Sequence, residues 1–377
     1  MRATTRREYS GQQTLYLALE LGWGEWKLGF TTGLGQKPRL RTMPAGDLTR
    51  LSEEIRRAKE RFHLPAKSRV VSCYEAGRDG FWLHRFLVAQ GVESQVVDSA
   101  SIEVNRRARR AKTDRLDVTK LVLMLVRYAE GERKVWSVVR VPSVEEEDRR
   151  QLHRELSMLK RERTRQSNRI KGLLASVGVR MAVLTHLAEQ LDQVRLWDGS
   201  PLAPGLRLRL QGEVERLEFI VGQIKELEEE RAELLRHSTA PEIEKVRQLV
   251  RLKGIGINSA WVDVMEFFAW RQFRNRRQVG ALAGLTPTPY TSGDGSREQG
   301  ISKAGNRHVR SMAIEIAWGW LRFQPKSKLT LWYRERFGHG NTRLRRIGIV
   351  AVARRLLVDL WRYVEFGVIP EGAELKA

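Results

Sequence analysis

The sequence predicts an α/β domain, a long helical region after it and a mostly helical C-terminal domain. Strand-like runs alternate with helical patterns before residue 140, a heptad-like pattern fills the middle of the chain, and apolar helical patterns return after residue 241. The chain has 377 residues, which is enough for two or three domains of about 150 residues each.

The first domain is predicted over residues 1–140. Its start, residues 1–13, is polar and basic and is expected to fray. β-rich runs then alternate with amphipathic helices, an order typical of a largely parallel sheet with helices on its faces. The predicted strands are residues 15–20, 25–30, 68–75 and 94–98, and the predicted helices are residues 47–62 and 79–90.

A helical region is predicted over residues 141–240, beginning after Pro142. Two long helical patterns, at about 143–177 and 208–237, flank a Gly/Pro-rich segment over residues 199–205. The two helices are therefore expected to form an antiparallel, coiled-coil-like pair. Such a pair can serve as a spacer, as a dimerisation arm or as a grip on nucleic acid.

The C-terminal domain is predicted over residues 241–377. Residues 254–256, Gly-Ile-Gly, separate two apolar helices and resemble the turn of a helix-hairpin-helix element, whose glycines let backbone N–H groups approach a phosphate. Glycines with this spacing also occur where helices simply pack closely. Residues 280–302 are expected to be rich in loops, and helices are expected at about 303–322 and 342–365.

Basic side chains dominate the composition. Lys and Arg number 68 and Asp and Glu number 45, so the formal net charge is +23 and the pI is about 10.7. A folded chain with a pI above about 9 usually binds nucleic acid. The single cysteine, Cys73, excludes an intrachain disulfide framework and a thiolate zinc site and favours a reducing compartment. The apolar run from Leu121 to Val126 is too short to span a bilayer, so we expect a cytoplasmic protein without membrane contact.

Four acids stand where a metal-dependent nuclease needs them. Glu20 and Glu75 end predicted strands, and Asp114 and Asp117 are three residues apart, so both can project from one face of a helix. Carboxylates in this arrangement can hold hard cations such as Mg²⁺, which activate the nucleophile in phosphoryl transfer. Each acid alone also fits a structural role: a favourable first helical turn, a solvated strand end or a pairing with arginine.

A basic segment leads directly into Asp114. Within residues 103–113 the expected phosphate contacts are Arg106, Arg107, Arg109, Arg110 and Lys112. A run of charges is more often a solvated surface, but its position before the acids favours phosphate steering. A second basic run lies at residues 160–165 on the first long helix.

Two serines, Ser292 and Ser302, lie in a Gly-rich segment near the C-terminus. Ser292 precedes Gly293 in a polar stretch that follows residues 282–287, and Ser302 precedes a basic helix start and has the position of an N-cap. A serine in such a segment is usually a turn residue. A catalytic role requires a base or a metal ion to activate its hydroxyl.

In these residues, the chain resembles the DEDD-type insertion-sequence transposases. This group is often called the IS-one-ten family and also contains the Piv-type DNA invertases. Three blocks carry the resemblance, which together with the glycine turn at residues 254–256 covers nearly the whole chain in order. They are residues 74–77 (Tyr-Glu-Ala-Gly) after the strand that ends at Glu20, residues 112–117, and residues 284–306 from Gly-Leu-Thr-Pro through Ser292 to Ser-Lys-Ala-Gly-Asn.

The resemblance implies a RuvC-like (RNase H-type) N-terminal domain and a C-terminal transposase domain. The acids Glu20, Glu75, Asp114 and Asp117 would bind Mg²⁺ or Mn²⁺. Ser292 would attack a DNA phosphodiester and form a covalent protein–DNA intermediate. The basic residues in and just after the third block, Lys303, Arg307 and Arg310, are expected to contact nucleic acid.

The resemblance also implies partners. Members act on DNA, at the ends of the element and at a target site, as homo-oligomers (dimers or tetramers) that combine domains of different protomers in one site. They use a structured non-coding guide RNA, so that base pairing selects the sequence while the protein holds the backbone.

The chain departs from the family at its first acid, which is normally aspartate and here is Glu20. Glu25 is an alternative counterpart, although the strand end favours Glu20. Two other functions therefore stay open. One is a RuvC-like, structure-specific endonuclease such as a junction resolvase, which needs the acids but not Ser292. The other is a non-catalytic nucleic-acid-binding protein derived from a transposase.

Overall fold

The computed structural model describes residues 14–77, 80–102, 114–181, 187–292 and 295–376, with the backbone alone at residues 100, 114, 115, 188, 289–292 and 295–299. The chain divides into two compact units, Met1–Pro142 and Ser143–Ala377. The α/β region predicted from the sequence fills the first unit. The second unit contains both the helical region and the C-terminal region that the sequence predicts as separate domains.

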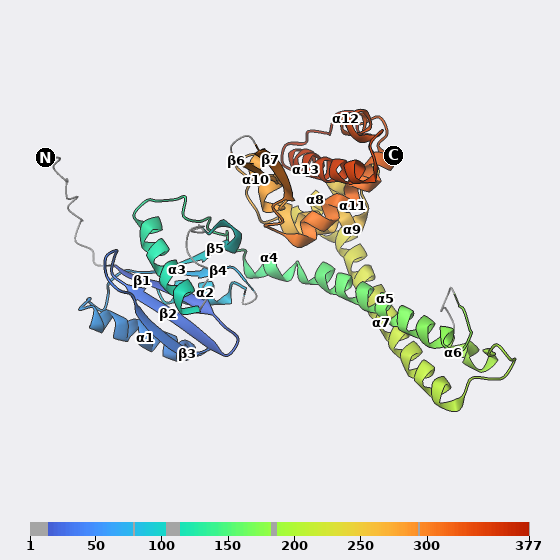
Figure 1. The fold of residues 1–377 in the computed structure, drawn as a ribbon, viewed down its shortest axis with the longest axis horizontal. Coiled ribbons are helices and arrows are strands. Elements are labelled where there is room, and N and C mark those ends of the chain that lie inside the picture. Colours follow the sequence, from blue (N-terminus) through green and yellow to red (C-terminus); the bar gives the residue numbers. More distant parts are fainter. Residues whose placement is uncertain (1–13, 78–79, 103–113, 182–186, 293–294, 377) are drawn as a thin grey trace. The chain divides into compact units, whose positions relative to one another are not determined.

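A mixed five-stranded sheet forms the centre of the first unit (Figure 1), with the strand order β3-β2-β1-β4-β5. β1 pairs with β2 and β2 pairs with β3 in antiparallel fashion, whereas β4 runs parallel to both β1 and β5. The strands are β1 (Leu15–Leu21), β2 (Glu25–Thr31), β3 (Arg39–Pro44), β4 (Val70–Glu75) and β5 (Glu93–Val97). The sequence does not predict β3, because it is an edge strand in which only Met43 is buried and the apolar alternation is missing.

Both faces of this sheet are covered, as the strand alternation requires. Leu15, Leu17 and Leu19 pack against one apolar cluster with residues of α1 (Leu48–Arg61) and α2 (Trp82–Ala89). Ala18 and Cys73 point to the opposite face and pack against α3 (Asp114–Ala129). Burying each large aliphatic side chain contributes about 1.5–3 kcal/mol, so the two-sided core explains why these runs form strands.

Gly29 lets α3 lie directly on the sheet. A Cβ atom at this position of β2 would stand 3.3 Å from both Val118 Cγ2 and Val118 O and 3.5 Å from Val122 Cγ1. A larger residue would therefore push the helix outward. The N-terminal half of α3 is held close to β1 and β2 by this contact.

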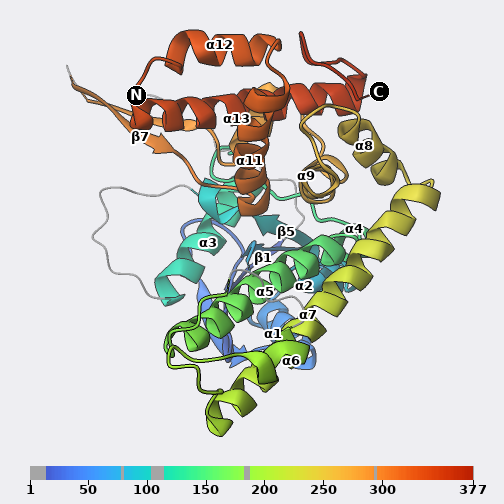
Figure 2. The same cartoon turned by 90° about the vertical axis from the view of Figure 1, so that its right-hand side faces the viewer.

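Two long antiparallel helices begin the second unit (Figures 1 and 2). α5 (Gln151–Ala175) and α7 (Pro204–His237) pack through Leu156, Leu159 and Ile224 at one end, and Ile170, Leu174, Leu210 and Val214 form a separate cluster toward the other end. Lys160 Nζ lies 2.6 Å from Glu228 Oε1, and Gln166 Nε2 donates a 2.5 Å hydrogen bond to Glu213 Oε2. The predicted helical pair is confirmed.

The helix predicted from residue 143 consists of two helices. α4 (Val144–Asp148) is capped by Ser143 and Glu146, each of which bonds the other's backbone N–H in a capping box. α5 follows after Arg149 and Arg150. Between α5 and α7 the described chain includes two short turns, α6 (Leu187–Gln190) and η2 (Leu191–Gln193).

The rest of the second unit packs helices around one aromatic-rich core, which includes Trp261, Phe267, Phe268 and Trp320. Two strands, β6 (Pro287–Ser292) and β7 (Gly295–Ile301), form an antiparallel hairpin beside the helices. The helices are α8 (Pro241–Val250), α9 (Ile257–Asp263), the π-helical turn η3 (Val264–Phe268), α10 (Arg276–Leu282), α11 (Arg307–Phe323), α12 (Lys328–Phe337) and α13 (Thr342–Phe366). Among the described residues, no helix is both long and apolar enough to cross a membrane.

Two sequence predictions in this region are wrong. The loop-rich segment expected over residues 280–302 contains the end of α10 and the β6–β7 hairpin. The helix expected from residue 303 begins at Arg307, and its N-cap is Asn306 rather than Ser302, because Oδ1 of Asn306 accepts hydrogen bonds from the N–H groups of His308 and Val309. Positive φ angles at Lys303 (55°) and Gly305 (112°) prevent the helix from starting earlier.

The glycine turn between α8 and α9 is accounted for by close packing. Gly254 has a φ of 84°, and a Cβ atom there would stand 3.0 Å from Phe323 Cβ on α11. The N–H of the preceding Lys253 donates to Glu374 O, and its carbonyl accepts from Gln324 Nε2. These contacts agree with the packing alternative for this turn.

Candidate functional site

The acids Glu20 and Glu75 lie on one face and at one edge of the sheet. β1 and β4 run parallel with Leu19 opposite Tyr74, so the next residues along the two strands are Glu20 and Glu75. Alternation from Ala18 and Cys73 puts both acids on the face that α3 covers. Glu20 is half-buried and Glu75 is exposed. The carboxyl edge of this parallel pair therefore carries two carboxylates side by side.

The helical acids begin the element that covers the same face. Asp114 is the first residue of α3, and Asp117 lies one turn before Leu121, which packs on the sheet. Asp117 is half-buried, and the structure describes only the backbone of Asp114. Among the side chains that the structure describes, no three Asp, Glu, His or Cys residues are gathered closely enough to hold a metal ion. The structure thus brings two of the four acids together and puts the other two on the facing helix.

Lys27 and Asp98, which no sequence motif predicts as site residues, border this pair of acids. Lys27 on β2 is the Cα partner of Glu20, and partners across an antiparallel pair share a face. Asp98 follows Val97, the Cα partner of Glu75, so the third parallel strand is also followed by an acid. A signal for it is present in the sequence, because Asp98 ends a β-rich run as Glu20 and Glu75 do.

Cys73 does not supply a nucleophile to this face. The side chain is fully buried, and its Sγ lies 4.0 Å from Leu121 O on α3. Burial, together with the nearby charge of Glu75, raises the pKa of the thiol well above its usual value. A protonated, enclosed thiol is unreactive, so Cys73 serves the packing of α3.

The residues predicted to contact phosphates differ in whether the structure describes them and in how exposed they are. Arg106, Arg107, Arg109, Arg110 and Lys112 lie outside the described residues. Lys303 and Arg307 are exposed near the start of α11, where they can meet a ligand. Arg310 is half-buried, and its Nη1 donates to the carbonyls of Lys303 (3.0 Å) and Ala283 (3.4 Å), so it stabilises the backbone around it.

Ser292 is the last residue of β6. Its Cα partner is Gly295, the first residue of β7, and the structure describes its backbone alone. Gly293 and Asp294, between the strands, lie outside the described residues. Ser292 thus belongs to the distal end of the hairpin.

Two glycines lock the base of this hairpin. A Cβ atom at Gly284 would stand 2.3 Å from Ala304 O, and one at Gly305 would stand 2.2 Å from Leu282 O. The N–H groups of Ser302, Lys303 and Asn306 donate to the carbonyls of Thr286, Gly284 and Leu282 at 2.8, 3.1 and 2.9 Å. The two motif segments are therefore pressed together backbone to backbone. We call residues 282–286 and 302–306 the hairpin base.

A buried carboxylate anchors the hairpin base to α5. Glu266, in η3, is fully buried and accepts hydrogen bonds from Arg154 Nε (2.6 Å), Arg154 Nη2 (2.9 Å), His153 Nε2 (2.9 Å) and Asn306 Nδ2 (2.9 Å). Burial alone would raise the pKa of Glu266, but the bonds from His153, Arg154 and Asn306 hold it well below its usual range. A buried ion satisfied on all sides in this way fixes its partners in one arrangement. No sequence pattern points to it, because His153 and Arg154 lie more than a hundred residues before Glu266.

The chain is similar to known transposases along its whole length. Residues 246–331, which contain η3, the hairpin and its base, match the model of the transposase family IS116/IS110/IS902. The protein y4rJ of Sinorhizobium fredii, named as a transposase, is 43% identical over 96% of this chain and 94% of its own length.

More distant relatives carry similar names. The transposase for insertion sequence element IS1328 of Yersinia enterocolitica is 29% identical over 44% of this chain and 48% of its own. That for IS1111A of Coxiella burnetii is 25% identical over 68% of each chain. With the hairpin base inside the matched region and y4rJ aligned almost end to end, the chain belongs to the IS116/IS110/IS902 family of transposases, whose activity is DNA transposition.

Proposed function

We propose that the protein moves an insertion sequence by a DEDD-type reaction in which Ser292 is the nucleophile. The observation that carries the proposal is the hairpin base, because two interlocked glycines and the anchored Asn306 hold β6, the strand that ends at Ser292. A nucleophile needs a fixed position relative to the phosphate that it attacks, and a hairpin with a rigid base provides one.

The chemistry at Ser292 is a phosphoryl transfer. The Oγ atom forms a bond to phosphorus while the bond from phosphorus to a deoxyribose oxygen breaks. The proton of the hydroxyl is lost to the solvent or a base, and the departing deoxyribose oxygen takes up a proton to become a hydroxyl group. A second transfer onto another DNA strand releases the serine.

A RuvC-like, RNase H-type first unit would supply the metal-binding acids. The mixed sheet with Glu20 and Glu75 at the carboxyl edge of neighbouring parallel strands supports this assignment. The donors are carboxylates, which fit Mg²⁺ or Mn²⁺, and Glu20, Glu75, Asp114 and Asp117 would hold the ion. Such an ion stabilises negative charge on the reacting phosphate.

The same proposal includes a guide RNA and a homo-oligomer. The net charge of +23 supports binding of more than one nucleic-acid strand. The α5–α7 pair presents long charged faces suited to assembly or to RNA contact. Arg106, Arg107, Arg109, Arg110, Lys112, Lys303 and Arg307 would contact phosphates.

Covalent trapping tests the proposal. The full-length protein is incubated with element-junction DNA, Mg²⁺ and the transcript that flanks the gene, and a denaturing gel then reports protein–DNA adducts. We expect an adduct from the wild type and from Ser302→Ala, whose serine belongs to the hairpin base, and none from Ser292→Ala. An adduct that persists in Ser292→Ala would overturn the assignment of the nucleophile.

The endonuclease alternative gives a different result. A metal-dependent nuclease without a serine intermediate cuts the DNA in both serine variants and forms no adduct. A non-catalytic binding protein gives neither cutting nor adduct, and Glu20→Asp then tests whether an aspartate restores activity.

A further inference from the structure

Seven arginines lie on α12 and on the N-terminal two-thirds of α13. Only one acid, Glu335, lies in the stretch of sequence that contains them. Six are exposed and Arg354 is half-buried. We call this set the α12–α13 arginine surface: Arg334, Arg336, Arg343, Arg345, Arg346, Arg354 and Arg355.

The two helices are held in a fixed relation. Figures 1 and 2 both show α12 alongside α13, and a Cβ atom at Gly348 would stand 2.6 Å from Phe337 Cγ and 2.8 Å from Tyr333 Cε2. The guanidinium of Arg355 lies over the ring of Trp332, 3.8 Å from its centroid. Stacking of this kind leaves the N–H groups at the edge of the guanidinium free to bind a planar or tetrahedral anion.

The charges of this surface are not neutralised by nearby acids. Within the part of the chain that the structure describes, none of the seven arginines forms an ion pair within 4.0 Å of a carboxylate. Burial and the neighbouring charges of Arg354 and Arg336 lower the pKa of Arg355, and the charge of Asp359 opposes them. The positive charges of Arg336 and Arg354 therefore act unfavourably on the charge of Arg355.

Three arginines also lie at a position on α13 that is unfavourable for positive charge. Arg343, Arg345 and Arg346 lie within the first five residues of α13, whose first turn contains no acid. The N-terminal end of a helix carries positive partial charge, so cations there are unfavourable and anions are favourable. Folding alone does not explain this arrangement, whereas a bound polyanion relieves all of these repulsions together.

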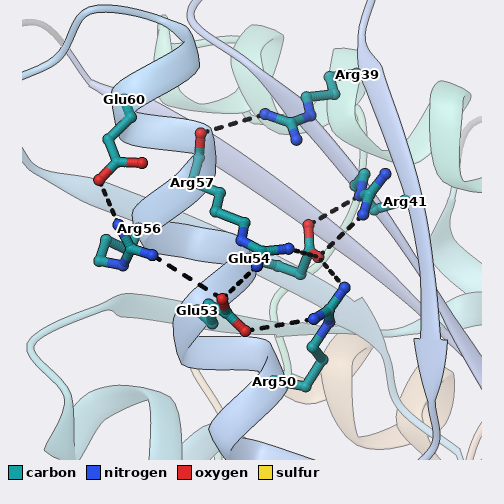
Figure 3. Close-up of polar contacts among 8 residues, drawn as sticks. All are labelled: Arg39, Arg41, Arg50, Glu53, Glu54, Arg56, Arg57 and Glu60. Carbon is teal, nitrogen blue, oxygen red and sulfur yellow. Dashed lines mark hydrogen bonds and ion pairs between the residues drawn. The ribbon is translucent and has the colours of Figure 1, made fainter.

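An arginine-rich helix in the first unit shows the opposite arrangement. On α1, Arg50, Arg56 and Arg57 contact Glu53, Glu54 or Glu60, and Arg41 of β3 donates two hydrogen bonds to Glu54 (Figure 3). These three arginines of α1 are thus paired with carboxylates within the fold. Neighbouring arginines on a helix of this protein can therefore be paired with acids of the same fold.

The α12–α13 arginine surface adjoins the hairpin base. The side chain of Arg354 lies against Gly280 of α10, where an added Cβ atom would stand 3.4 Å from Arg354 Cγ and 3.8 Å from Thr286 Cγ2. Gly280 O also accepts a hydrogen bond from the N–H of Leu285. A strand lying along these arginines would pass beside the segment that supports β6.

We propose that the α12–α13 arginine surface binds the phosphate backbone of the DNA duplex that is presented to Ser292. The identity of the substrate rests on the proposed function, and the binding itself does not. Arginine binds phosphate oxygens in a bidentate manner, and neighbouring phosphates allow several guanidinium groups to engage at once. This surface holds the substrate without reading its sequence.

The test is the salt dependence of DNA binding. Fluorescence anisotropy measures binding of a labelled duplex of arbitrary sequence to the full-length Ser292→Ala protein, without Mg²⁺, at several NaCl concentrations. The variant carries Arg343→Gln and Arg346→Gln, two exposed side chains to which the structure assigns no hydrogen bond or ion pair with another described residue. The matched control carries Arg56→Gln and Arg57→Gln on α1, which removes the same charge from paired positions.

We expect the α13 variant to bind more weakly and its slope of log K against log salt to become shallower. The change should be about 0.9 for each phosphate that the variant no longer neutralises, so about 2 in total. The control keeps the wild-type slope. Equal slopes in the two variants would overturn the proposal, and so would a weakening confined to a labelled RNA hairpin. A changed slope together with a wild type that forms no serine adduct would leave this surface in place and reject Ser292 as the nucleophile.

Discussion

Asn306 Nδ2 donates a 2.9 Å hydrogen bond to the buried Oε2 of Glu266, while Oδ1 of the same side chain caps α11. One amide thus connects the start of α11, the hairpin base and the π-helical turn. Arg154 and His153 bring α5 to the same carboxylate. The supports of the hairpin therefore meet at a single buried charge.

Glu266→Gln should destabilise the second unit by about 3 kcal/mol, because it removes the charge that Arg154 and His153 face while leaving both of them in place. Urea unfolding followed by circular dichroism measures the change. The control is Glu155→Gln on the exposed side of α5, for which we expect less than about 0.5 kcal/mol. Equal effects of the two changes would contradict a central role for Glu266.

The pH dependence of stability should carry the signature of Glu266. Its pKa is well below the usual 4.5, so its contribution is fully present above that value and is lost as the pH falls toward the folded pKa. The unfolding free energy should therefore decrease as the pH is lowered below about 4.5. In Glu266→Gln this decrease should be smaller. If the variant loses as much unfolding free energy at acid pH as the wild type does, Glu266 is not the group responsible.

Asp263 should change the unfolding free energy with pH in the direction opposite to Glu266. It is fully buried, neither carboxyl oxygen has a hydrogen-bond partner among the described residues, and burial raises its pKa well above the usual 3.8. The folded state keeps the proton, so stability is greatest below the unfolded pKa and is lost as the pH rises toward the folded one. Asp263→Asn should therefore stabilise the protein at pH 7, by about 1.4 kcal/mol for each unit of the shift removed up to that pH. Thermal unfolding at pH 7 decides this, and a destabilised Asn variant would contradict it.

Gly305→Ala should disrupt the hairpin base. The residue combines a φ of 112° with a Cβ position 2.2 Å from Leu282 O. Gly300 offers a matched control, because its φ is 85° but none of the described atoms lies within 4 Å of its Cβ position. Strain should cost about 1–3 kcal/mol in both variants, and overpacking should add about 1–3 kcal/mol at Gly305 alone. If the two variants unfold at the same urea concentration, the glycines do not interlock.

Glu20→Ala and Glu75→Ala should each lower Mg²⁺-dependent strand cleavage by about 100-fold or more, since a catalytic ion contributes several kcal/mol of transition-state stabilisation. DNA binding without Mg²⁺ should persist in both. Glu25→Ala is the control, because Glu25 is exposed at the start of β2 opposite Pro44, five residues along the chain from Glu20. A loss of cleavage in Glu25→Ala and not in Glu20→Ala would exchange their roles.

The sequence predicts the elements whose residues alternate or repeat clearly. β1, β2, β4 and β5, the helices α1 and α13 and the α5–α7 pair all occur within a few residues of the predicted positions. β3 escapes prediction because an edge strand needs few buried residues. The β6–β7 hairpin escapes it because prolines at 287 and 289 resemble a loop, while pairing with β7 supplies the order that β6 lacks locally.

The residues of the candidate site can likewise be divided into those that a sequence pattern predicts and those that it does not. Glu20 and Glu75 could be brought together from the sequence, because acids at the ends of parallel strands share an edge. Glu266 and the α12–α13 arginines could not be identified from the sequence, because their roles depend on which residues surround them in the fold. Glu266 matters through residues more than a hundred positions away, and the arginines matter because no acid among the described residues pairs with them.

The π-helical turn η3 changes the angular phase of the segment that contains it. A widened turn accommodates one extra residue and shifts the following side chains by about 100° around the axis. Every residue from Ala260 to Phe268 is buried, which no regular helix with a single apolar stripe achieves. Glu266 lies within this widened turn, and its carboxylate is bonded to Asn306 from there. Deletion of one residue between 264 and 268 is therefore a more severe change than most substitutions, since it alters the orientation of the whole segment at once.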